Sequence, residues 1–331
     1  MKKKEKGFLI VHPAFIGDVI LATSVVESLR AKFPEEPIDF FVRKGNEGIL
    51  ANNPHIRNLY VWDKKHNKFA NLLKLTGQIR KNRYIAVINL HRFFNSGLLT
   101  ALARAKYKAG FSQNPFAVVY SHKVKFEFKP GLHETERYHK VVSFLDVPLK
   151  RPKMYPSDDD FAKVEKYKSG KYVCIAPASV WFTKQLPAEK WIELIDNYLP
   201  QDFTVYLLGA GQDKDLCDSI KEKCKTESRI EVLAGKLSLQ ESAALMKDAV
   251  MNYTNDSAPL HICSAMNAPV TAVFCSTVPE FGFTPLSDNS RIVETTEKLP
   301  CRPCGIHGKK ECPERHFRCA YSIDVKRMGL G

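Results

Sequence analysis

Short apolar runs alternate with longer amphipathic segments along this chain, and the alternation occurs twice. The first series predicts strands at residues 7–12, 38–42, 59–62 and 84–90, with helices after Gly17-Asp18, at 68–81 and at 133–145. The second series predicts strands at 172–176, 204–208, 229–233, 249–253 and 270–274, with helices at 188–198, 212–224, 238–247 and 258–266. Apolar strands separated by amphipathic helices are typical of parallel sheets with helices on both faces. The expected fold class is therefore α/β.

A proline-rich linker near residues 148–156 separates the two series. The full length of 331 residues is too long for one typical domain and suits two. We therefore expect two Rossmann-like domains, 1–155 and 156–300, with their sheets facing a cleft, and a Cys-rich C-terminal tail at 301–331. Ligands of open α/β sheets bind at the carboxyl ends of the strands, so functional loops should follow strands.

The composition excludes several protein classes. With 44% hydrophobic residues the chain is not disordered, and it contains no low-complexity tract of a fibrous protein. No apolar run approaches the roughly 20 residues of a membrane-spanning helix. The basic start leads into a short apolar run that ends at Pro13, which indicates a first strand rather than a signal peptide. We therefore expect a cytoplasmic protein.

The positive charge is concentrated in the first half of the chain. Residues 1–155 contain 28 Lys and Arg against 12 Asp and Glu, which leaves +16, whereas residues 156–331 contain 22 against 24, which leaves −2. This asymmetry favours an anionic partner for the first half. Nucleic acid, a phosphorylated glycolipid and an acidic membrane surface are candidates, and a merely solvated surface is the alternative.

A turn from strand to helix contains the first candidate residues, His12, Gly17 and Asp18. Gly17 permits a tight turn, and Asp18 lies at the predicted helix start. Asp18 is therefore either a helix N-cap or a general base directed into the cleft. The turn contains no GxGxxG motif, which argues against a dinucleotide-dependent dehydrogenase.

A second candidate loop, residues 177–187, follows a predicted strand and precedes a helix. Its hydroxyl groups and its cation, which include Thr183 and Lys184, suit a phosphate group. The loop lacks the glycines of a P-loop, so nucleotide hydrolysis of that kind is not expected. The alternative is a solvated loop with an exposed lysine.

The third candidate is the segment 255–261, which also follows a strand and opens a helix. Small residues at a helix N-terminus leave backbone amides available for an anion, and the helix dipole adds attraction. His261, one turn into the helix, is either a packing residue or a functional one.

Four motifs together resemble glycosyltransferase family 9, the ADP-heptose:lipopolysaccharide heptosyltransferases, over nearly the full length. The motifs, in chain order, are Gly17-Asp18, Thr183-Lys184 with Pro187 and Trp191, Gly235-Lys236-Leu237-Ser238-Leu239, and Asn255-Asp256-Ser257 with His261. The resemblance implies a GT-B fold of two Rossmann-like domains, with the acceptor on the N-terminal domain and the sugar nucleotide on the C-terminal one. It also implies inversion at the anomeric carbon without a catalytic metal or other cofactor.

The resemblance assigns roles to individual residues. Asp18 would be the base that deprotonates the acceptor hydroxyl, with Gly17 and His12 on the acceptor side. Lys184 would face the diphosphate, with Thr183 beside it. The remaining donor-binding positions that it implies are Asp256, Ser257 and Ala258 for the diphosphate, His261 close by, and Glu231 for the ribose.

Four of the nine cysteines crowd the C-terminus: Cys301, Cys304, Cys312 and Cys319. Their spacing is typical of a structural zinc site remote from catalysis. Disulfides, which a reducing cytoplasm disfavours, and unligated thiols are the alternatives. The other five cysteines are scattered through apolar or helical segments as ordinary thiols.

Three functional hypotheses follow. The first is heptose transfer from ADP-heptose to an anionic, lipid-linked lipopolysaccharide core acceptor, by a cytoplasmic enzyme peripheral to the inner face of the cytoplasmic membrane. The second keeps this fold but uses another nucleotide sugar or glycan acceptor. The third, more distant, is a basic nucleic-acid-binding protein, for which His91-Arg92-Phe93-Phe94 and Tyr107-Lys108 are the only hints; with the first two hypotheses no nucleic-acid partner is expected.

Overall fold

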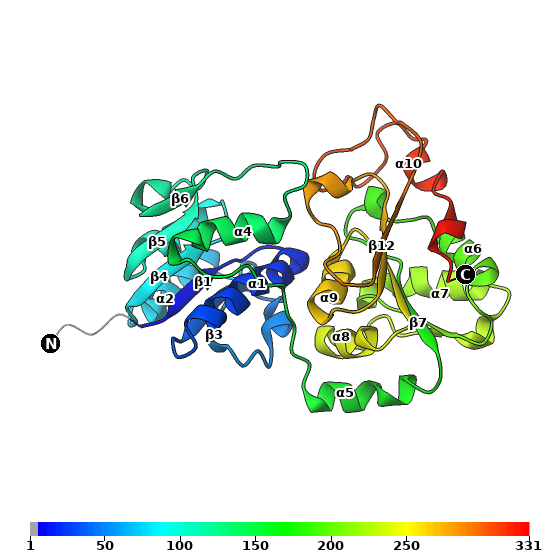
Figure 1. Ribbon diagram of the computed structural model, residues 1–331, viewed down its shortest axis with the longest axis horizontal. Coiled ribbons are helices and arrows are strands. Elements are labelled where there is room, and N and C mark those ends of the chain that lie inside the picture. Colours follow the sequence, from blue (N-terminus) through cyan, green and yellow to red (C-terminus); the bar gives the residue numbers. More distant parts are fainter. Residues whose placement is uncertain (1–5, 331) are drawn as a thin grey trace. The chain divides into compact units, whose positions relative to one another are not determined.

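The computed structural model describes residues 6–330 and divides into two compact units, Met1–Tyr155 and Pro156–Gly331 (Figure 1). Each unit contains one six-stranded parallel sheet with helices around it, so the predicted α/β class is confirmed. Within the described residues, no helix has the length and apolar content that crossing a bilayer requires.

The sheet of the first unit has the strand order β3-β2-β1-β4-β5-β6. Its strands are β1 (Phe8–Val11), β2 (Ile38–Arg43), β3 (Ile56–Trp62), β4 (Tyr84–Asn89), β5 (Ala105–Phe111) and β6 (His122–Val124). Its helices are α1 (Ile16–Lys32), α2 (Lys68–Ile79), α3 (Phe94–Leu102) and α4 (Glu134–Val142). All four residues of β1 are fully buried because β2 and β4 flank this strand and helices cover it. The order reverses between β1 and β4, and such a switch point is where open α/β sheets bind ligands.

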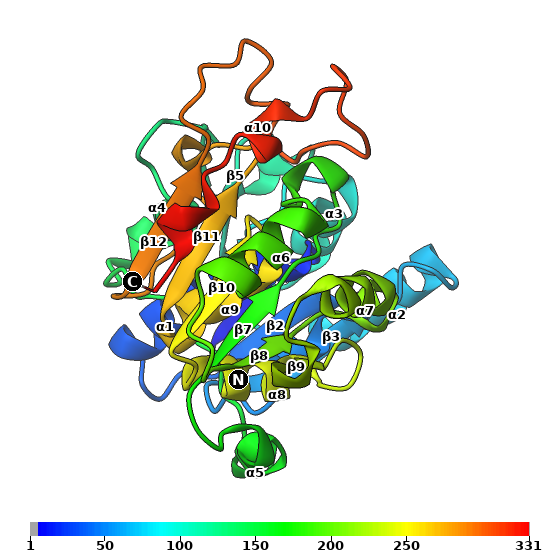
Figure 2. The ribbon, with the colours of Figure 1, turned by 90° about the vertical axis from the view of Figure 1, so that its right-hand side faces the viewer.

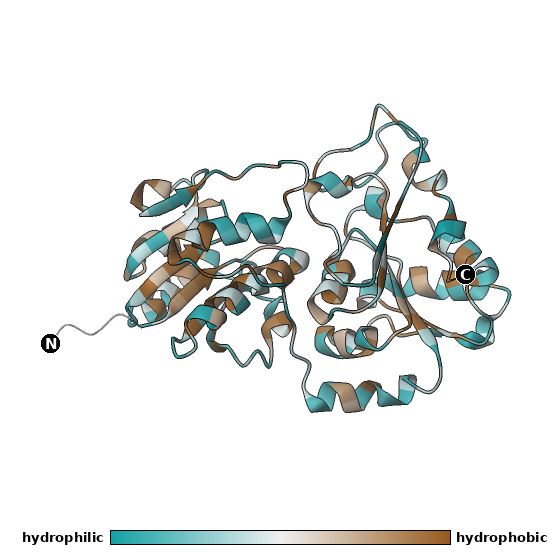
Figure 3. Cartoon of the chain, viewed as in Figure 1, coloured by the Kyte–Doolittle hydropathy of each residue, from teal (hydrophilic) through white to brown (hydrophobic). Residues whose placement is uncertain are grey.

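The sheet of the second unit has the equivalent order, β12-β11-β10-β7-β8-β9, with its switch point between β7 and β10. Its strands are β7 (Tyr172–Ala176), β8 (Thr204–Leu207), β9 (Ile230–Val232), β10 (Met251–Asn255), β11 (Val270–Phe274) and β12 (Ser290–Glu294). Its helices are α5 (Asp158–Val164), α6 (Ala188–Asn197), α7 (Lys214–Lys223), α8 (Leu239–Lys247), α9 (Ala258–Met266) and α10 (Arg318–Tyr321). Figure 1 shows α8 and α9 on one side of this sheet and α6 and α7 on the other. Apolar residues concentrate in the strands and on the helix faces that cover them (Figure 3).

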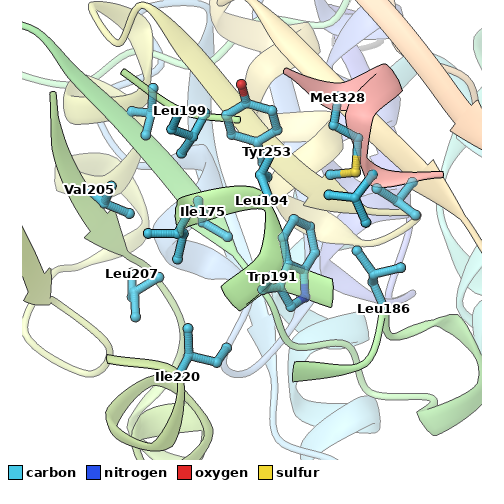
Figure 4. Packing of buried hydrophobic residues seen from close by; sticks show 14 of the residues in the cluster. Ile175, Leu186, Trp191, Leu194, Leu199, Val205, Leu207, Ile220, Tyr253 and Met328 are labelled. Atoms are coloured by element: carbon cyan, nitrogen blue, oxygen red, sulfur yellow. The ribbon is translucent and has the colours of Figure 1, made fainter. Parts of the chain in front are cut away.

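A buried cluster between β7, β8, β10 and α6 forms one core of the second unit (Figure 4). Trp191 and Leu194 of α6 lie at its centre, and both are fully buried. The C-terminal residues Phe317, Cys319 and Met328 belong to the same cluster. Residues of the predicted C-terminal tail therefore supply part of the core of the second unit.

Candidate functional site

Two loops that follow neighbouring parallel strands meet at the switch point of the second unit. The loop after β7 contains Thr183 and Lys184, and Asp256 comes directly after β10. The Lys184 ammonium lies 2.6 Å from an Asp256 carboxylate oxygen, and the two side chains are only 14% and 6% exposed. The hydroxyl of Thr277, from the loop after β11, donates to the same oxygen at 2.7 Å. Three loops thus converge on one carboxylate.

Buried polar groups hold the Lys184 loop against its neighbours. The Asn255 side-chain carbonyl accepts from the Leu186 amide at 2.9 Å, and its NH2 group donates to the Pro177 carbonyl at 2.8 Å. The Ser276 hydroxyl donates to the Thr183 hydroxyl at 2.9 Å, and the Ser276 amide donates to the Thr183 carbonyl at 3.2 Å. These bonds fix the backbone on both sides of Lys184. Sequence reasoning gave no individual role to Asn255, Ser276 or Thr277, although all three lie in polar stretches at strand ends.

The N-terminus of α9 adjoins this ion pair. Ser257 holds the N-cap position in an extended conformation, and among the described residues its side chain caps no amide of α9. Its hydroxyl instead lies 3.4 Å from the Asn255 carbonyl. Amides at a helix start without such a cap can bind an anion, and the helix dipole favours one. His261 is buried one turn further along α9, with its ring 6.3 Å from that of Phe283.

Glu231 lies apart from this group of residues. It occupies the middle of β9 and is paired in register with Tyr206 of β8. The Tyr206 hydroxyl donates to the Tyr167 carbonyl at 2.7 Å. Burial, aided by the Glu231 charge, raises the pKa of Tyr206 to about 12. Glu231 therefore lies beside Tyr206 on the edge strand of this sheet, two strands away from β7.

Asp18 lies in the first turn of α1, at the carboxyl end of β1. The helix begins at Ile16 with Phe15 at the N-cap, so Gly17 and Asp18 are already helical and the interpretation of Asp18 as the N-cap is wrong. The carboxylate of Asp18 interacts electrostatically with Arg43, the last residue of β2. Burial lowers the pKa of the Arg43 guanidinium, and the Asp18 charge opposes that shift.

His12 is a buried polar residue beside the same turn. Its Nε2 atom lies 3.2 Å from the Tyr138 hydroxyl of α4, and its own amide donates to the Phe41 carbonyl at 2.9 Å. Burial lowers the pKa of His12 well below its ordinary value, and the nearby His91 lowers it further. His12 is therefore a neutral imidazole at neutral pH, which packs beneath the turn.

Three basic side chains from separate strand ends surround His91, which follows β4. Burial lowers the pKa of His91 to about 3, and the charges of Lys64, Arg92 and Arg43 contribute. Lys64 donates to the Pro13 carbonyl at 3.3 Å. The Arg43 guanidinium lies 4.8 Å from the centre of the Phe15 ring. The excess positive charge of the first half is thus partly focused at the carboxyl edge of its sheet, close to Asp18. Sequence reasoning missed Arg43 and Lys64, because their convergence depends on strand order.

The structure does not support the predicted zinc site. Across residues 6–330, no group of three or more His, Cys, Asp or Glu side chains is placed to hold a metal ion. Cys319 is buried in α10, and the Cys304 thiol donates to the Cys301 carbonyl at 3.2 Å. Cys301 has the Nε2 atom of His316 at 3.9 Å, and Cys312 is a free, half-buried thiol. The direction of each thiol therefore depends on the local backbone conformation, which the spacing of the cysteines in the sequence does not determine.

Comparisons of the sequence and of the structure with known proteins point to the same family. The family model of glycosyltransferase family 9 (heptosyltransferase) matches residues 72–315. Lipopolysaccharide heptosyltransferase 3 from Escherichia coli is 30% identical over 283 residues, which are 80% of this chain and 82% of that protein. A solved glycosyltransferase family 9 structure from Veillonella parvula DSM 2008 has a TM-score of 0.79 at 23% identity, covering 88% of this chain and 86% of its own. E. coli ADP-heptose LPS heptosyltransferase II has a TM-score of 0.75 at 20% identity, covering 94% and 96%. These neighbours confirm the predicted GT-B fold.

Proposed function

The chain belongs to glycosyltransferase family 9, the heptosyltransferases, and from this premise we propose that it transfers heptose from ADP-heptose to a hydroxyl group of a phosphorylated lipopolysaccharide core acceptor. The names of the relatives, which specify lipopolysaccharide and ADP-heptose, support this substrate pair. The observation that carries the proposal is the meeting of Lys184, Asp256 and the N-terminus of α9 at a switch point.

The diphosphate leaving group would bind at this N-terminus. Breaking the bond between the sugar and the diphosphate leaves negative charge on the departing oxygen. The Lys184 ammonium and the amides of Ser257 and Ala258 would stabilise that charge as it develops, which lowers the barrier to reaction. Because the ammonium is already held by Asp256 and the amides lie at the start of α9, little reorganisation would accompany the reaction. In the proposed reaction these groups, and not a metal ion, stabilise the leaving group.

Other predicted donor residues fit this arrangement to different degrees. Thr183 would fix the loop, because its hydroxyl and carbonyl are engaged by Ser276. His261, buried in α9, would line the site from within the helix. Glu231 remains a proposed ribose contact, at a position on β9 beside Tyr206 of β8.

Asp18 would act as the general base. A carboxylate in the first turn of α1, at the switch point of the first sheet, is placed where open sheets present functional groups. It would take the proton from the acceptor hydroxyl as that oxygen attacks the anomeric carbon, which inverts the configuration there. His12 would support the turn as a neutral packing partner. A positioned base typically contributes about 10²–10⁴-fold to the rate.

The basic side chains around His91 would face the anionic acceptor. Arg43 lies near Asp18, and Lys64 donates to Pro13 of the turn that precedes Asp18, so the phosphates of the acceptor and its reacting hydroxyl could be held by one edge of the sheet. The same excess charge would attract the protein to anionic lipid at the cytoplasmic face of the membrane. We therefore propose a cytoplasmic, peripheral enzyme.

Thermal-shift measurement with nucleotide sugars tests the proposed donor. A donor that binds only the folded state stabilises by mass action, by about 2.7 kcal/mol at one hundred times its dissociation constant. We expect stabilisation by ADP-heptose and by ADP, with smaller effects of UDP and GDP sugars. Selective stabilisation by a UDP or GDP sugar would replace ADP-heptose with that donor, and indifference to every nucleotide would refute sugar transfer.

A further inference from the structure

Residues 301–309, which we call the strap, lie directly on the loop that contains Lys184. The Lys309 amide donates to the Thr183 hydroxyl at 2.8 Å, and the Thr183 amide donates to the Lys309 carbonyl at 3.1 Å. These two bonds join segments that are 126 positions apart in the sequence. In Figure 2 the strap belongs to the orange loops that precede α10. The strap therefore adds two hydrogen bonds to those by which Asn255 and Ser276 hold the Lys184 loop.

Gly308 brings the backbone of the strap close to Lys184. Its φ of +75° is in the left-handed region, and a Cβ atom at this position would lie 2.9 Å from Lys184 Cγ. The same atom would lie 3.0 Å from Thr183 Oγ1 and 3.3 Å from Trp181 Cβ. Because the other two atoms are a hydrogen-bonded hydroxyl oxygen and a Cβ carbon fixed next to the backbone, a movement of Lys184 alone cannot relieve the contact. Only glycine fits here without displacing the loop.

The other end of the strap is fixed to the loop after β11. Arg302 donates to the carbonyls of Cys275 at 2.7 Å and Thr277 at 2.8 Å, and it forms an ion pair with Glu294 of β12. The Cys304 amide donates to the Ser276 carbonyl at 3.0 Å. The strap thus joins the two loops that supply Lys184 and Thr277 to the Asp256 carboxylate.

We propose that the strap determines where the Lys184 ammonium lies, with Gly308 and Arg302 as positioning residues for donor binding. This inference rests on the proposed function of Lys184 toward the diphosphate. A lysine on an unrestrained loop would lose conformational entropy when a diphosphate binds, whereas the strap removes that freedom beforehand. An electrostatic group also stabilises the leaving group best when its position is fixed before the reaction.

A matched pair of glycine variants tests the inference. Gly305 also has a left-handed φ, +85°, but a Cβ atom there would meet nothing within 4 Å. Gly305→Ala and Gly308→Ala therefore carry similar backbone strain, and only the second pushes on Lys184. We expect Gly308→Ala to raise the dissociation constant of ADP and to lower kcat, each by about tenfold or more, while Gly305→Ala stays within about twofold of the parent.

Amide hydrogen exchange of the peptide that covers residues 181–186 gives a readout independent of activity. We expect faster exchange there in Gly308→Ala than in Gly305→Ala, with unchanged exchange in α2 of the first unit. Equal exchange in the two variants, or faster exchange with unchanged ADP affinity, would overturn the proposal. The function proposed for Lys184 has its own test, because Lys184→Ala should weaken ADP binding. Unchanged ADP binding in Lys184→Ala would refute that function, and the exchange rates at 181–186 would still show whether the strap holds the loop.

Arg302→Gln keeps the test decisive where Gly308→Ala does not fold. Its control is Arg318→Gln, because Arg318 forms an ion pair with Glu297 in the same region but is 59% exposed. We expect Arg302→Gln to weaken ADP binding and to speed exchange at 181–186, and Arg318→Gln to change neither. The same small effect in both variants would show that the strap does not position Lys184.

Discussion

Lys184→Met should destabilise the second unit strongly, because it leaves the Asp256 carboxylate without its cation. Asp256 is only 6% exposed, and the hydrogen bond from Thr277 does not replace the positive charge that this variant removes. Methionine preserves most of the packing of the lysine stem, so the variant isolates the charge. Asp256→Asn is the converse change, which keeps an oxygen that can accept from Thr277 and leaves Lys184 able to extend toward water.

The burial of the pair sets the magnitude. Removing one partner of a fully buried ion pair costs about 3–5 kcal/mol, and the 14% exposure of Lys184 reduces this to about 2–3 kcal/mol. For a unit of this size, that corresponds to a fall in Tm of about 4–12 °C. Asp256→Asn should cost only about 1 kcal/mol, because the lysine that remains can be solvated. The double variant should be more stable than the sum of the two changes by about 1 kcal/mol.

Differential scanning calorimetry of the four proteins measures these effects. Lys214 and Asp218 supply the control, since they form an ion pair in the same unit with side chains 56% and 34% exposed. Lys214→Met should cost under about 0.5 kcal/mol. Additive effects of Lys184→Met and Asp256→Asn, or a cost of Lys184→Met no larger than that of the control, would refute the reasoning from burial.

Four further predictions concern the base, the buried histidine, the thiols and the charge. Asp18→Asn should lower kcat by about 10²–10⁴-fold with unchanged ADP affinity in calorimetric titration, and retained turnover would exclude it as the base. The folded state holds the pKa of His91 at about 3, against about 6.5 when unfolded, so the unfolding free energy should rise with pH across this interval. Urea unfolding at several pH values should show a flatter profile for His91→Gln, and an identical profile would contradict the shift. Ellman's reagent should react with Cys301, Cys304 and Cys312, which are half-buried, and with the six buried cysteines only after denaturation; rapid reaction of all nine would contradict the packing. Finally, the KM for the anionic acceptor should rise several-fold from about 50 to about 300 mM NaCl, with a smaller change in ADP affinity, because salt screens the exposed charges of the first unit; equal salt effects would argue against this division.

The interior strands could be predicted from the sequence because both of their faces are buried. The strand at 270–274 and the helix at 258–266 are found at the predicted residues. Strands buried on both faces appear as continuous apolar runs, which are visible without any knowledge of their neighbours.

The sequence analysis missed β5, β6 and β12, which lie toward the sheet edges. β5 contains Lys106 and Lys108, β6 has only three residues, and the first two residues of β12 are exposed. β6 and β12 are edge strands, which pair on one side only and tolerate polar side chains, so their apolar pattern is weak. β5 pairs with both β4 and β6, but its two lysines interrupt the apolar run that would mark it as a strand.

The candidate residues of the second unit were predictable, but the contacts among them were not. Lys184 and Asp256 both follow strands, and the order of the sheet brings these strand ends together. The ion pair depends in addition on the direction of each side chain, which the packing of three loops determines. The contact of Gly308 with Lys184 was hidden for the same reason, because the strap has no periodic pattern.

The two units use one strand order for two different electrostatic tasks. In the second unit, the negative charge of Asp256 offsets the positive charge of Lys184. Attraction of a diphosphate there would therefore depend on the positions of the α9 amides and of the Lys184 ammonium rather than on a net positive charge. In the first unit, Arg43, Lys64 and Arg92 gather around a neutral histidine, and a large positive excess remains. The proposed donor requires stabilisation at the one bond that breaks, whereas the phosphates of the proposed acceptor would bind apart from that bond. The large positive charge of the first unit therefore suits the larger, anionic acceptor, and the small net charge of the second unit suits the donor. Where the net charge is small, attraction of the diphosphate depends on the position of one ammonium, and the strap holds Lys184 in that position.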